Sequence, residues 1–428
     1  MGTFVEVPLP PGRKAVKSKW VFKKKTLADG SLDKYKARVV AKGFSQRYGE
    51  DYTETFSPVV RQSTVRVVLV VVVTRRMKRL QLDIKTAFLN STIQEEIYME
   101  PVEGYENDDG YVWLLKRDLY GLKQASRSWY EKLRADETLM IILVYVDDIS
   151  AFAMRDADLF DFKASMEATF EVNIFNDINY FLGLELQWSF SGDEVRVSQH
   201  KYADTILDRF GMKNVRPAAT PMDEQYRNCL FQEQDLTTFK PRPALGALLY
   251  LLVLTRPDIS TAVRLLAQET ERPTAALKVG IENVFRYLKS TKEYGLVIRD
   301  GTEHDGLVVY RDAAFAVERE RKYSTGFAIF YDGNLVEWGS KKQGTVTLSS
   351  TEDEYITMAT GLQECIGIML VLKDLGIVTK NIVVMEDNQG ARHLAESKGV
   401  TQRSRHIDTK YHWLREKVSD GLNILLSL

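Results

Sequence analysis

Two acidic residues close an apolar run near the middle of the chain and offer the first candidate chemistry. Asp147 and Asp148 follow the stretch Met140–Val146, in which every residue is apolar or tyrosine. Adjacent carboxylates at the end of an apolar strand repel each other and lose hydration, so they persist cheaply only beside a cation or in a water-exposed turn. Taken alone, the pair favours an exposed hairpin turn, because aspartate is a common turn former.

A third acid in a similar setting favours metal chemistry instead. Asp83 also closes an apolar strand, within the stretch Gln81–Asn90. Three carboxylates from two strands can hold two divalent metal ions about 3.5–4 Å apart, as in polymerases. Mg²⁺ takes oxygen ligands, which carboxylates and substrate phosphates supply. Such ions lower the pKa of a primer 3′-hydroxyl and stabilise a leaving pyrophosphate.

The hydropathy pattern predicts the elements that must position these acids. It indicates a strand leading into a turn or helix start at 80–90, and a hairpin of buried strands at 139–152. Short strands are expected over 15–60, with a turn at Ala28–Gly30. Helical patterns cover 156–170, 201–211, 241–270 and 274–290. From Gly295 onward we expect strand-like runs, a helix at Ser350–Leu375, a strand at Ile382–Met385 and a helical tail, which together indicate a separate α/β domain.

Composition sets the class of protein and a candidate partner. A chain of 428 residues is expected to form two or three domains, and 44% hydrophobic with 27% charged residues is typical of soluble globular protein. The stretch from Gly12 to Arg47 holds 12 Lys or Arg against 2 acids. Interleaved aromatics such as Trp20 and Phe22 indicate folded strands with a basic face. That face is either a solvated surface or a contact for nucleic acid.

Cysteine content and apolar runs bear on compartment and membrane. Cys229 and Cys365 lie far apart and form neither a disulfide framework nor a zinc motif, so a reducing intracellular compartment is expected. The N-terminal stretch lacks the apolar core of a signal peptide. The run Val65–Val73 is far shorter than the roughly 20 residues that span a bilayer, so we expect a buried element and no membrane partner.

Several stretches in a fixed order resemble the reverse transcriptase of copia-type LTR retrotransposons. They are KWVFKKK, YKARVVAKGFSQRYGEDYTETFSPVV, QLDIKTAFLN, LYGLKQASRSWYEKL, ILVYVDDIS, YFLGLEL, QHKYADTILDRFGM, ATPMD and LLYLLVLTRPDIS. The resemblance implies an α+β fold, a right-hand polymerase of fingers, palm and thumb followed by an α/β ribonuclease H-like domain. The implied parts are a tail (1–13), fingers and palm (14–200), a thumb or connection region (201–294) and the ribonuclease H-like domain (295–428). Asp83, Asp147 and Asp148 would then be the catalytic, metal-binding triad.

The resemblance also implies substrate-binding residues. Phe88 stands where related enzymes place an aromatic under the sugar, which would favour deoxynucleotides; a core phenylalanine is the alternative. Arg38 and Lys42 match positions that bind the triphosphate, a task suited to their charge. The alternatives for both are solvated strand residues or contacts to template phosphates. Tyr120 and Gly121 would lie near the templating base pair.

Four acids in the C-terminal part resemble the ribonuclease H domain of the same family, whose STGFAIF and EWGSKKQ signatures are also present. They are Asp312, Glu354, Asp387 and Asp408, with Glu352 competing with Glu354 for the ligand role. In the family such acids hold two Mg²⁺ ions, and an activated water cuts the RNA strand of a hybrid. His406 and His412 do not complete a zinc set. His406 is expected to contact substrate or to lie beside Asp408, and the helix that carries His412 either contacts phosphates or faces solvent.

The resemblance also implies partners and cofactors, and the sequence departs from the family pattern at three places. We expect an RNA template, a DNA primer, RNA–DNA hybrid and deoxynucleoside triphosphates, two Mg²⁺ (or Mn²⁺) ions per site, and a cytoplasmic virus-like particle or nuclear location; the oligomeric state stays open. The family's segment around 134–143 is shortened here, β-branched valines replace an Ala/Leu-rich helix, and Ala314 and Phe315 replace the second acid and the tryptophan of SDADW. An inactive remnant that still binds nucleic acid, or a ribonuclease H alone, are the alternatives.

Overall fold

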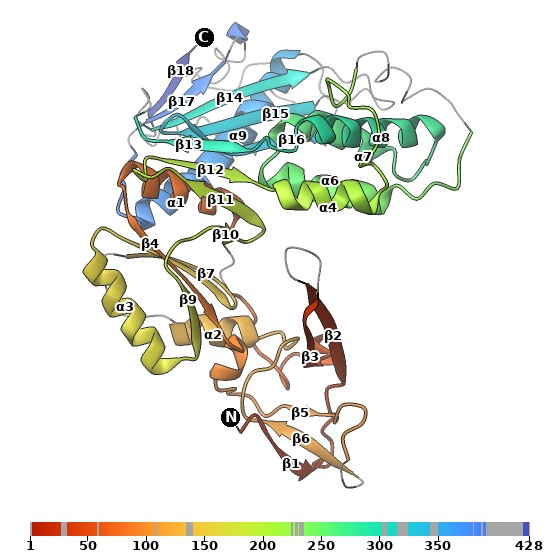
Figure 1. The fold of residues 1–428 in the computed structure, drawn as a ribbon, viewed down its shortest axis with the longest axis vertical. Helices are drawn as coiled ribbons and strands as arrows, with labels where there is room; N and C mark the ends of the chain where they lie inside the picture. The colour runs from red at the N-terminus through yellow and green to blue at the C-terminus, as the bar shows by residue number, and fades with distance from the viewer. Residues whose placement is uncertain are drawn as a thin grey trace, which may run out of the picture. The chain divides into compact units, whose positions relative to one another are not determined.

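The computed structural model forms two compact units. The first contains Met1–Val60 and Lys78–Asp177, and the second contains Arg61–Met77 and Ile178–Leu428. The predicted fingers-and-palm stretch, 14–200, therefore contributes to both units (Figure 1). The structure describes residues 2–26, 32–57, 60–106, 108, 110–133, 140–223, 226, 230, 235–301, 306–314, 324–342, 350–379, 381–386, 388–390 and 423–427.

A four-stranded antiparallel sheet forms the centre of the first unit. Its order is β7-β8-β4-β9, with bounds Met140–Tyr145, Asp148–Ala153, Lys78–Ile84 and Val172–Phe175. This confirms the strands and the hairpin predicted from the apolar runs. Helix α3 (Asp156–Thr169) packs against β4 and β8, and helix α2 (Ala125–Leu133) packs near the short 3₁₀ helix η2 (Ala87–Asn90). Leu82, Ile84 and Ile149 lie in the resulting core.

Two smaller sheets complete the first unit. Strands β2 (Ser18–Thr26) and β3 (Leu32–Ala41) form the hairpin expected around Ala28–Gly30, whose turn lies outside the described residues; the 3₁₀ helix η1 (Gly43–Ser45) follows. Strands β1 (Phe4–Pro8), β6 (Tyr111–Leu115) and β5 (Tyr98–Met99) form a sheet of order β1-β6-β5. The prediction of a tail at 1–13 is therefore wrong, because the backbone of Phe4–Pro8 pairs fully with β6 and Phe4 stacks on Trp113.

The valine run forms a helix in spite of its composition. Helix α1 (Gln62–Thr74) belongs to the second unit, and every residue of Val65–Val73 is buried. The helix propensity of valine costs roughly 0.5 kcal/mol per residue relative to alanine. Burying a valine side chain contributes about 1.5 kcal/mol or more, so tertiary packing outweighs the local preference.

A second four-stranded sheet leads into a helical region. Its order is β10-β11-β12-β13, with bounds Tyr180–Phe181, Leu184–Trp188, Glu194–Ser198 and Leu296–Arg299. The run after Gly295 thus pairs with β12 and not with the later strands, because its alternating Leu296 and Ile298 complete a core that β12 begins. The predicted helices are present as α4 (His200–Arg209), α6 (Arg242–Leu254), α7 (Ser260–Gln268) and α8 (Ala275–Ser290), with η3 (Pro257–Ile259) between α6 and α7.

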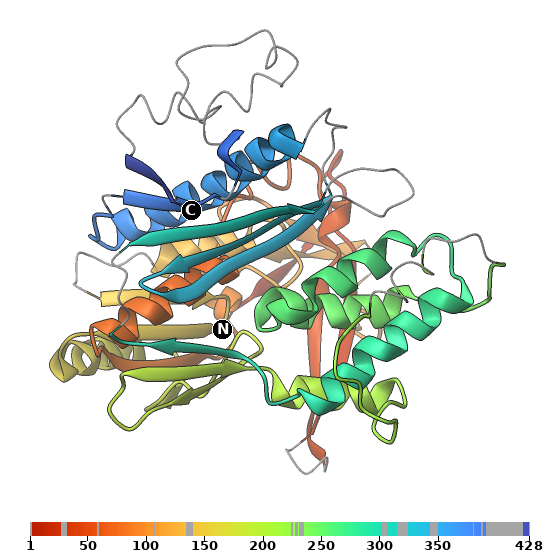
Figure 2. The ribbon, with the colours of Figure 1, turned by 90° about the horizontal axis from the view of Figure 1, so that it is seen from above.

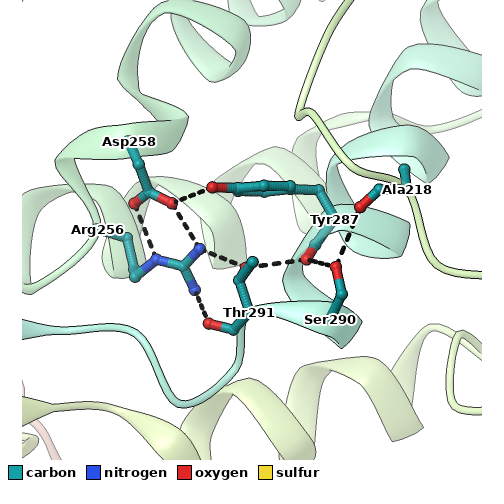
Figure 3. A network of polar contacts seen from close by, with 6 residues as sticks. All are labelled: Ala218, Arg256, Asp258, Tyr287, Ser290 and Thr291. Carbon is teal, nitrogen blue, oxygen red and sulfur yellow. Dashed lines mark hydrogen bonds and ion pairs between the residues drawn. The ribbon is translucent and has the colours of Figure 1, made fainter.

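A buried arginine fastens η3 to the end of α8. Arg256 is 2% exposed and binds both carboxylate oxygens of Asp258, at 2.8 and 2.6 Å (Figure 3). Its Nη1 donates to the carbonyl oxygen of Thr291 at 2.9 Å, and Nη2, which also donates to Asp258, donates to the hydroxyl oxygen of Thr291 at 2.7 Å. Tyr287 donates to Asp258 from the same helix, at 2.9 Å. The charges of Arg256 and Asp258 are each matched by an opposite charge or a polar group, so a structural role in packing the helical region accounts for both residues.

A five-stranded sheet carries the C-terminal part of the second unit. Its order is β16-β15-β14-β17-β18, with bounds Asn334–Lys342, Ser324–Tyr331, Leu307–Ala314, Asn381–Met385 and Asn423–Ser427. Strand β14 is antiparallel to β15 and parallel to β17. A helical tail is the prediction after Met385, but residues 423–427 pair as a strand with β17, and residues 391–422 lie outside the described residues.

Helix α9 (Ser350–Asp374) lies along this sheet and packs against β14 and β15, as Figures 1 and 2 show. Its Ile356–Asp374 segment is long and apolar enough to cross a membrane by length and composition, and half of it is buried inside the structure. The apolar face that contacts the sheet explains that composition.

Candidate active site

The turn that carries Asp147 is held in a conformation that valine rarely adopts. Val146 has φ +55°, a left-handed value that is unusual for a β-branched residue. The indole N–H of Trp129, a side chain that is buried, donates to the carbonyl of Val146 at 2.8 Å. The N–H of Ile84 donates to the carbonyl of Asp147 at 2.8 Å. A strained turn persists where its surroundings fix it, and these two bonds do so from α2 and β4.

The three acids predicted for the first unit come together at this turn. Asp83 and Asp148 are direct partners in the β4–β8 register, and Asp147 precedes Asp148 in the turn. Burial raises the pKa of Asp147 above its ordinary value, and the charge of Asp83 raises it further, whereas Tyr120 and Arg38 oppose this shift. The structure thus brings one carboxylate from β4 beside two from the hairpin.

Tyr120 and Arg38 both hold the side chain of Asp147. The Tyr120 hydroxyl donates to Oδ1 of Asp147 at 2.7 Å, and Nη2 of Arg38 lies 3.8 Å from Oδ2. The guanidinium carbon of Arg38 also lies 5.0 Å from the centroid of the Tyr120 ring. Burial and the bond to Asp147 raise the pKa of Tyr120, so the phenol remains a proton donor at neutral pH.

Phe88 and Gly121 determine the position of Tyr120. The Phe88 ring is buried and lies 4.7 Å from the Tyr120 ring, centroid to centroid. Gly121 has φ +96°, and a β-carbon there would lie 2.1 Å from the carbonyl oxygen of Ala41. The N–H of Ala41 in turn donates to the carbonyl of Tyr120 at 2.9 Å. Glycine therefore permits a close approach of this turn to β3, which fixes Tyr120.

Lys42 is linked to its surroundings through its backbone. It lies one residue after β3, where its N–H donates to Lys17 and its carbonyl accepts from Ser45. In the ranges that the structure describes, we find no polar contact from Lys42 to Asp147 or Tyr120. The structure therefore groups Arg38, Phe88, Tyr120 and Gly121 around the acids, while the triphosphate role of Lys42 stays a prediction.

The carboxylates engage protein partners here. Oδ2 of Asp83 accepts from Nδ2 of Asn173 at 3.1 Å, and Asp147 accepts from Tyr120. Across the described ranges no group of three His, Cys, Asp or Glu side chains is arranged to hold a metal ion. The donor set itself, three carboxylates on adjoining strands, is the oxygen chemistry that Mg²⁺ prefers.

Three residues near the site escaped prediction as functional residues. Trp129 lies within the stretch Leu119–Leu133 that carries the resemblance, but no pattern signals its bond to Val146. Asn173 has no sequence signal, because its contact depends on β9 pairing with β4. Asp118 precedes Leu119 and is fully buried, an environment that its charged neighbours in the sequence do not indicate.

The second set of acids is only partly described. The backbone of Asp312 lies in β14, whereas its side chain, together with Asp387, Asp408, His406 and His412, lies outside the described residues. The side chain of Glu354 is buried on α9. One of its carboxylate oxygens accepts from Nη1 of Arg311 at 2.8 Å. Of the four predicted acids, the structure therefore describes only the side chain of Glu354, and this carboxylate binds Arg311.

Comparison with known proteins identifies the family. A family model described as "Reverse transcriptase (RNA-dependent DNA polymerase)" matches residues 1–140 and 134–224, more than half of the chain. The two pieces meet at 134–140, within the segment predicted to be shortened. Retrovirus-related Pol polyprotein from transposon TNT 1-94 of Nicotiana tabacum is 34% identical over 453 residues, covering 98% of this chain and 34% of the relative. The one from transposon RE1 of Arabidopsis thaliana is 36% identical over 442 residues, covering 97% and 30%.

A solved structure supports the fold. The foamy viral protease-reverse transcriptase in complex with dsDNA superposes with a TM-score of 0.53 at 13% identity, covering 99% of this chain and 79% of that one. At that identity the likeness concerns the fold alone. The chain spans about a third of the length of the two curated Pol relatives. From the matched model and these relatives, this chain belongs to the reverse transcriptase (RNA-dependent DNA polymerase) family, in its copia-type retrotransposon Pol branch.

Proposed function

We propose that the first unit is the fingers and palm of an RNA-directed DNA polymerase. The observation that carries this proposal is the pairing of Asp83 with Asp148 across β4 and β8, with Asp147 on a turn fixed by Trp129. Acids placed on a rigid sheet hold a constant geometry while substrates change, which nucleotidyl transfer requires. The family assignment supports the same reaction.

Asp83, Asp147 and Asp148 would hold two Mg²⁺ ions, or Mn²⁺. Bound ions of this kind supply positive charge beside a primer hydroxyl and a triphosphate. The raised pKa of Asp147 indicates that its buried charge lacks full compensation from the protein, as expected of a carboxylate that binds a cation. Tyr120 and Arg38 contact Asp147 and compensate its charge only in part.

The hairpin of β2 and β3 would bind phosphates. Arg38 is paired with Val21, and Lys36 with Lys23, so these four side chains share one face of the hairpin. The charge of Lys36 lowers the pKa of Asp147, which supports a basic face directed at the acids. This face suits a deoxynucleoside triphosphate or the backbone of an RNA template and DNA primer. Phe88, packed on Tyr120, would exclude a ribose 2′-hydroxyl.

Primer extension on an RNA template tests the proposal. Asp147→Asn is expected to lower extension by at least about 100-fold, because the variant loses one of the carboxylate charges that would hold the metal ions beside the transferring phosphate. Asp161→Asn, on the exposed side of α3, is the matched control and is expected to extend normally. Normal extension by Asp147→Asn would refute the site. Phe88→Ala is expected to incorporate ribonucleotides more readily than the wild type.

We infer that residues 295–428 include a ribonuclease H-like domain that binds RNA–DNA hybrid. A mixed five-stranded sheet of order β16-β15-β14-β17-β18, with Asp312 on central β14 and α9 packed against it, supports this assignment. The residues described do not fit metal-dependent cleavage, since the buried carboxylate of Glu354 is bound to Arg311. Hybrid binding that weakens steeply with added KCl is expected. Undiminished binding in high salt would contradict this assignment.

A further inference from the structure

A buried arginine lies between two buried glutamates in the five-stranded sheet. Arg311, on β14, has no exposed side-chain surface. Its Nη1 donates to the Oε2 of Glu354 at 2.8 Å and to the backbone carbonyl of the same residue at 2.6 Å. Its Nη2 forms an ion pair with Glu386, whose side chain is also fully buried. The three residues come from β14, α9 and the end of β17.

This cluster adjoins three of the acids predicted as metal ligands. Arg311 directly precedes Asp312, Glu386 directly precedes Asp387, and Glu354 is itself one of the four. Strands β14 and β17 are parallel neighbours, with Tyr310 beside Met385 in the register. The residues that follow, Arg311 and Glu386, are therefore brought together by the sheet itself. In the SDADW motif that this segment resembles, the position of Arg311 is a serine.

Charge balance assigns a role to the guanidinium. A buried carboxylate is stable only beside a cation or strong donors. In a metal-dependent site the cation is the metal ion, whereas here the single positive charge of Arg311 already lies beside the carboxylates of both Glu354 and Glu386. A divalent ion would have to displace a guanidinium anchored by two hydrogen bonds, or bind next to a like charge. Arginine remains protonated in proteins and cannot activate a water molecule as a bound metal does.

We propose that Arg311 is a built-in cation that takes the place of a metal ion at Glu354, so that this domain binds hybrid without cutting it. The inference rests on the proposed ribonuclease H-like fold of residues 295–428. It is independent of the polymerase site, which lies in the other unit. Under this proposal the chain keeps metal-dependent polymerisation in the first unit and lacks metal-dependent cleavage of the hybrid in the second.

Backbone cleavage by bound iron tests this in the full chain. Fe²⁺ in place of Mg²⁺, with ascorbate and peroxide, generates hydroxyl radicals that cut the chain near each bound ion, and mass spectrometry maps the cuts. For the wild type we expect cuts near Asp83 and Asp147 and none near Glu354. Cuts near Glu354 in the wild type would overturn the proposal, whatever any variant does.

The double variant Arg311→Ser, Glu386→Gln removes the cation together with one of its partners. We expect cuts near Glu354 to appear, with site affinity rising about 10–100-fold, the range typical of groups adjoining metal ligands. Glu386→Gln alone keeps Arg311 and is expected to show no such cuts. Retained cuts at Asp147 and an unchanged circular dichroism spectrum show that the double variant is folded. If this folded variant gains no cuts near Glu354, the role of Arg311 is also refuted. Loss of cuts near Asp83 and Asp147 alone would contradict the proposed polymerase site and leave this comparison intact.

Discussion

Replacing Asp118 by asparagine tests whether a buried acid makes the first unit sensitive to pH. Asp118 is fully buried, and its N–H donates to the carbonyl of Ser91 at 3.2 Å. The nearby hydroxyls of Ser91 and Ser128 donate to backbone carbonyls. In the described part of the chain no hydrogen bond of ordinary geometry reaches either carboxylate oxygen of Asp118, so the two serine hydroxyls compensate its charge only weakly. Burial raises the pKa of Asp118 to about 7, and the charge of Glu95 raises it too, against a partial lowering by the two serines.

The sign of the effect follows from the order of the two pKa values. Well below pH 3.8 the carboxyl group is protonated in both folded and unfolded chains, so its ionisation does not change the free energy of unfolding. Between about pH 4 and 7 the unfolded chain releases the proton while the folded chain keeps it, so the free energy of unfolding falls as pH rises. The interval from the ordinary pKa of 3.8 to about 7, at ~1.4 kcal/mol per pKa unit, gives a loss of up to about 4 kcal/mol at pH 8.

Urea unfolding of the wild type and Asp118→Asn, followed by tryptophan fluorescence from pH 4 to 8.5, measures this loss. Asparagine cannot ionise, so the variant is expected to match the wild type near pH 4. Above pH 7 it should be more stable by up to about 4 kcal/mol. Asp161→Asn, which replaces an exposed acid of the same unit, should follow the wild type throughout. A stability difference that does not change with pH would refute the buried ionisation.

Three further substitutions probe contacts inside the first unit (Trp129 and Gly121) and inside the second unit (Arg66). Trp129→Phe removes the bond to the Val146 carbonyl, and we expect a loss of about 1–3 kcal/mol in unfolding free energy with slower primer extension; full extension would show that the turn holds itself. Gly121→Ala places a methyl group 2.1 Å from the Ala41 carbonyl, so both stability and extension should fall, and an unaltered melting temperature would contradict that close approach. The buried guanidinium of Arg66 donates to the carbonyls of Val336 and Val253, and Arg66→Met leaves both without this donor. Denaturant unfolding of the second unit should show a loss of about 3–5 kcal/mol in unfolding free energy, which Arg66→Lys does not restore.

The pattern of apolar residues predicts much of the local structure. The runs ending at Asp83 and Asp147 indicated buried strands, and β4, β7 and β8 confirm them. Helices α4, α7 and α8 follow from the 3.6-residue period of their apolar positions. Periodicity works here because it reports burial of one face, which each of these elements possesses.

Local preference failed where packing was stronger. The valines of α1 disfavour a helix, yet burial against β13 and β16 stabilises one. Phe4–Pro8 has no strong strand signal, and β6 supplies the partner that makes it a strand. These outcomes depend on neighbours distant in the sequence, which a local pattern does not contain.

The sequence by itself determined the candidate acids Asp83, Asp147 and Asp148, because each closes an apolar run and the ordered motifs around them indicate a polymerase. Only the tertiary structure decided what each acid faces: a fixed turn and paired strands for these three, burial with little compensation of charge for Asp118, and an arginine for Glu354. The physical reason is that residue type and spacing set which groups are present along a strand or helix. The charge state and partner of a buried group depend instead on elements brought together from distant parts of the chain.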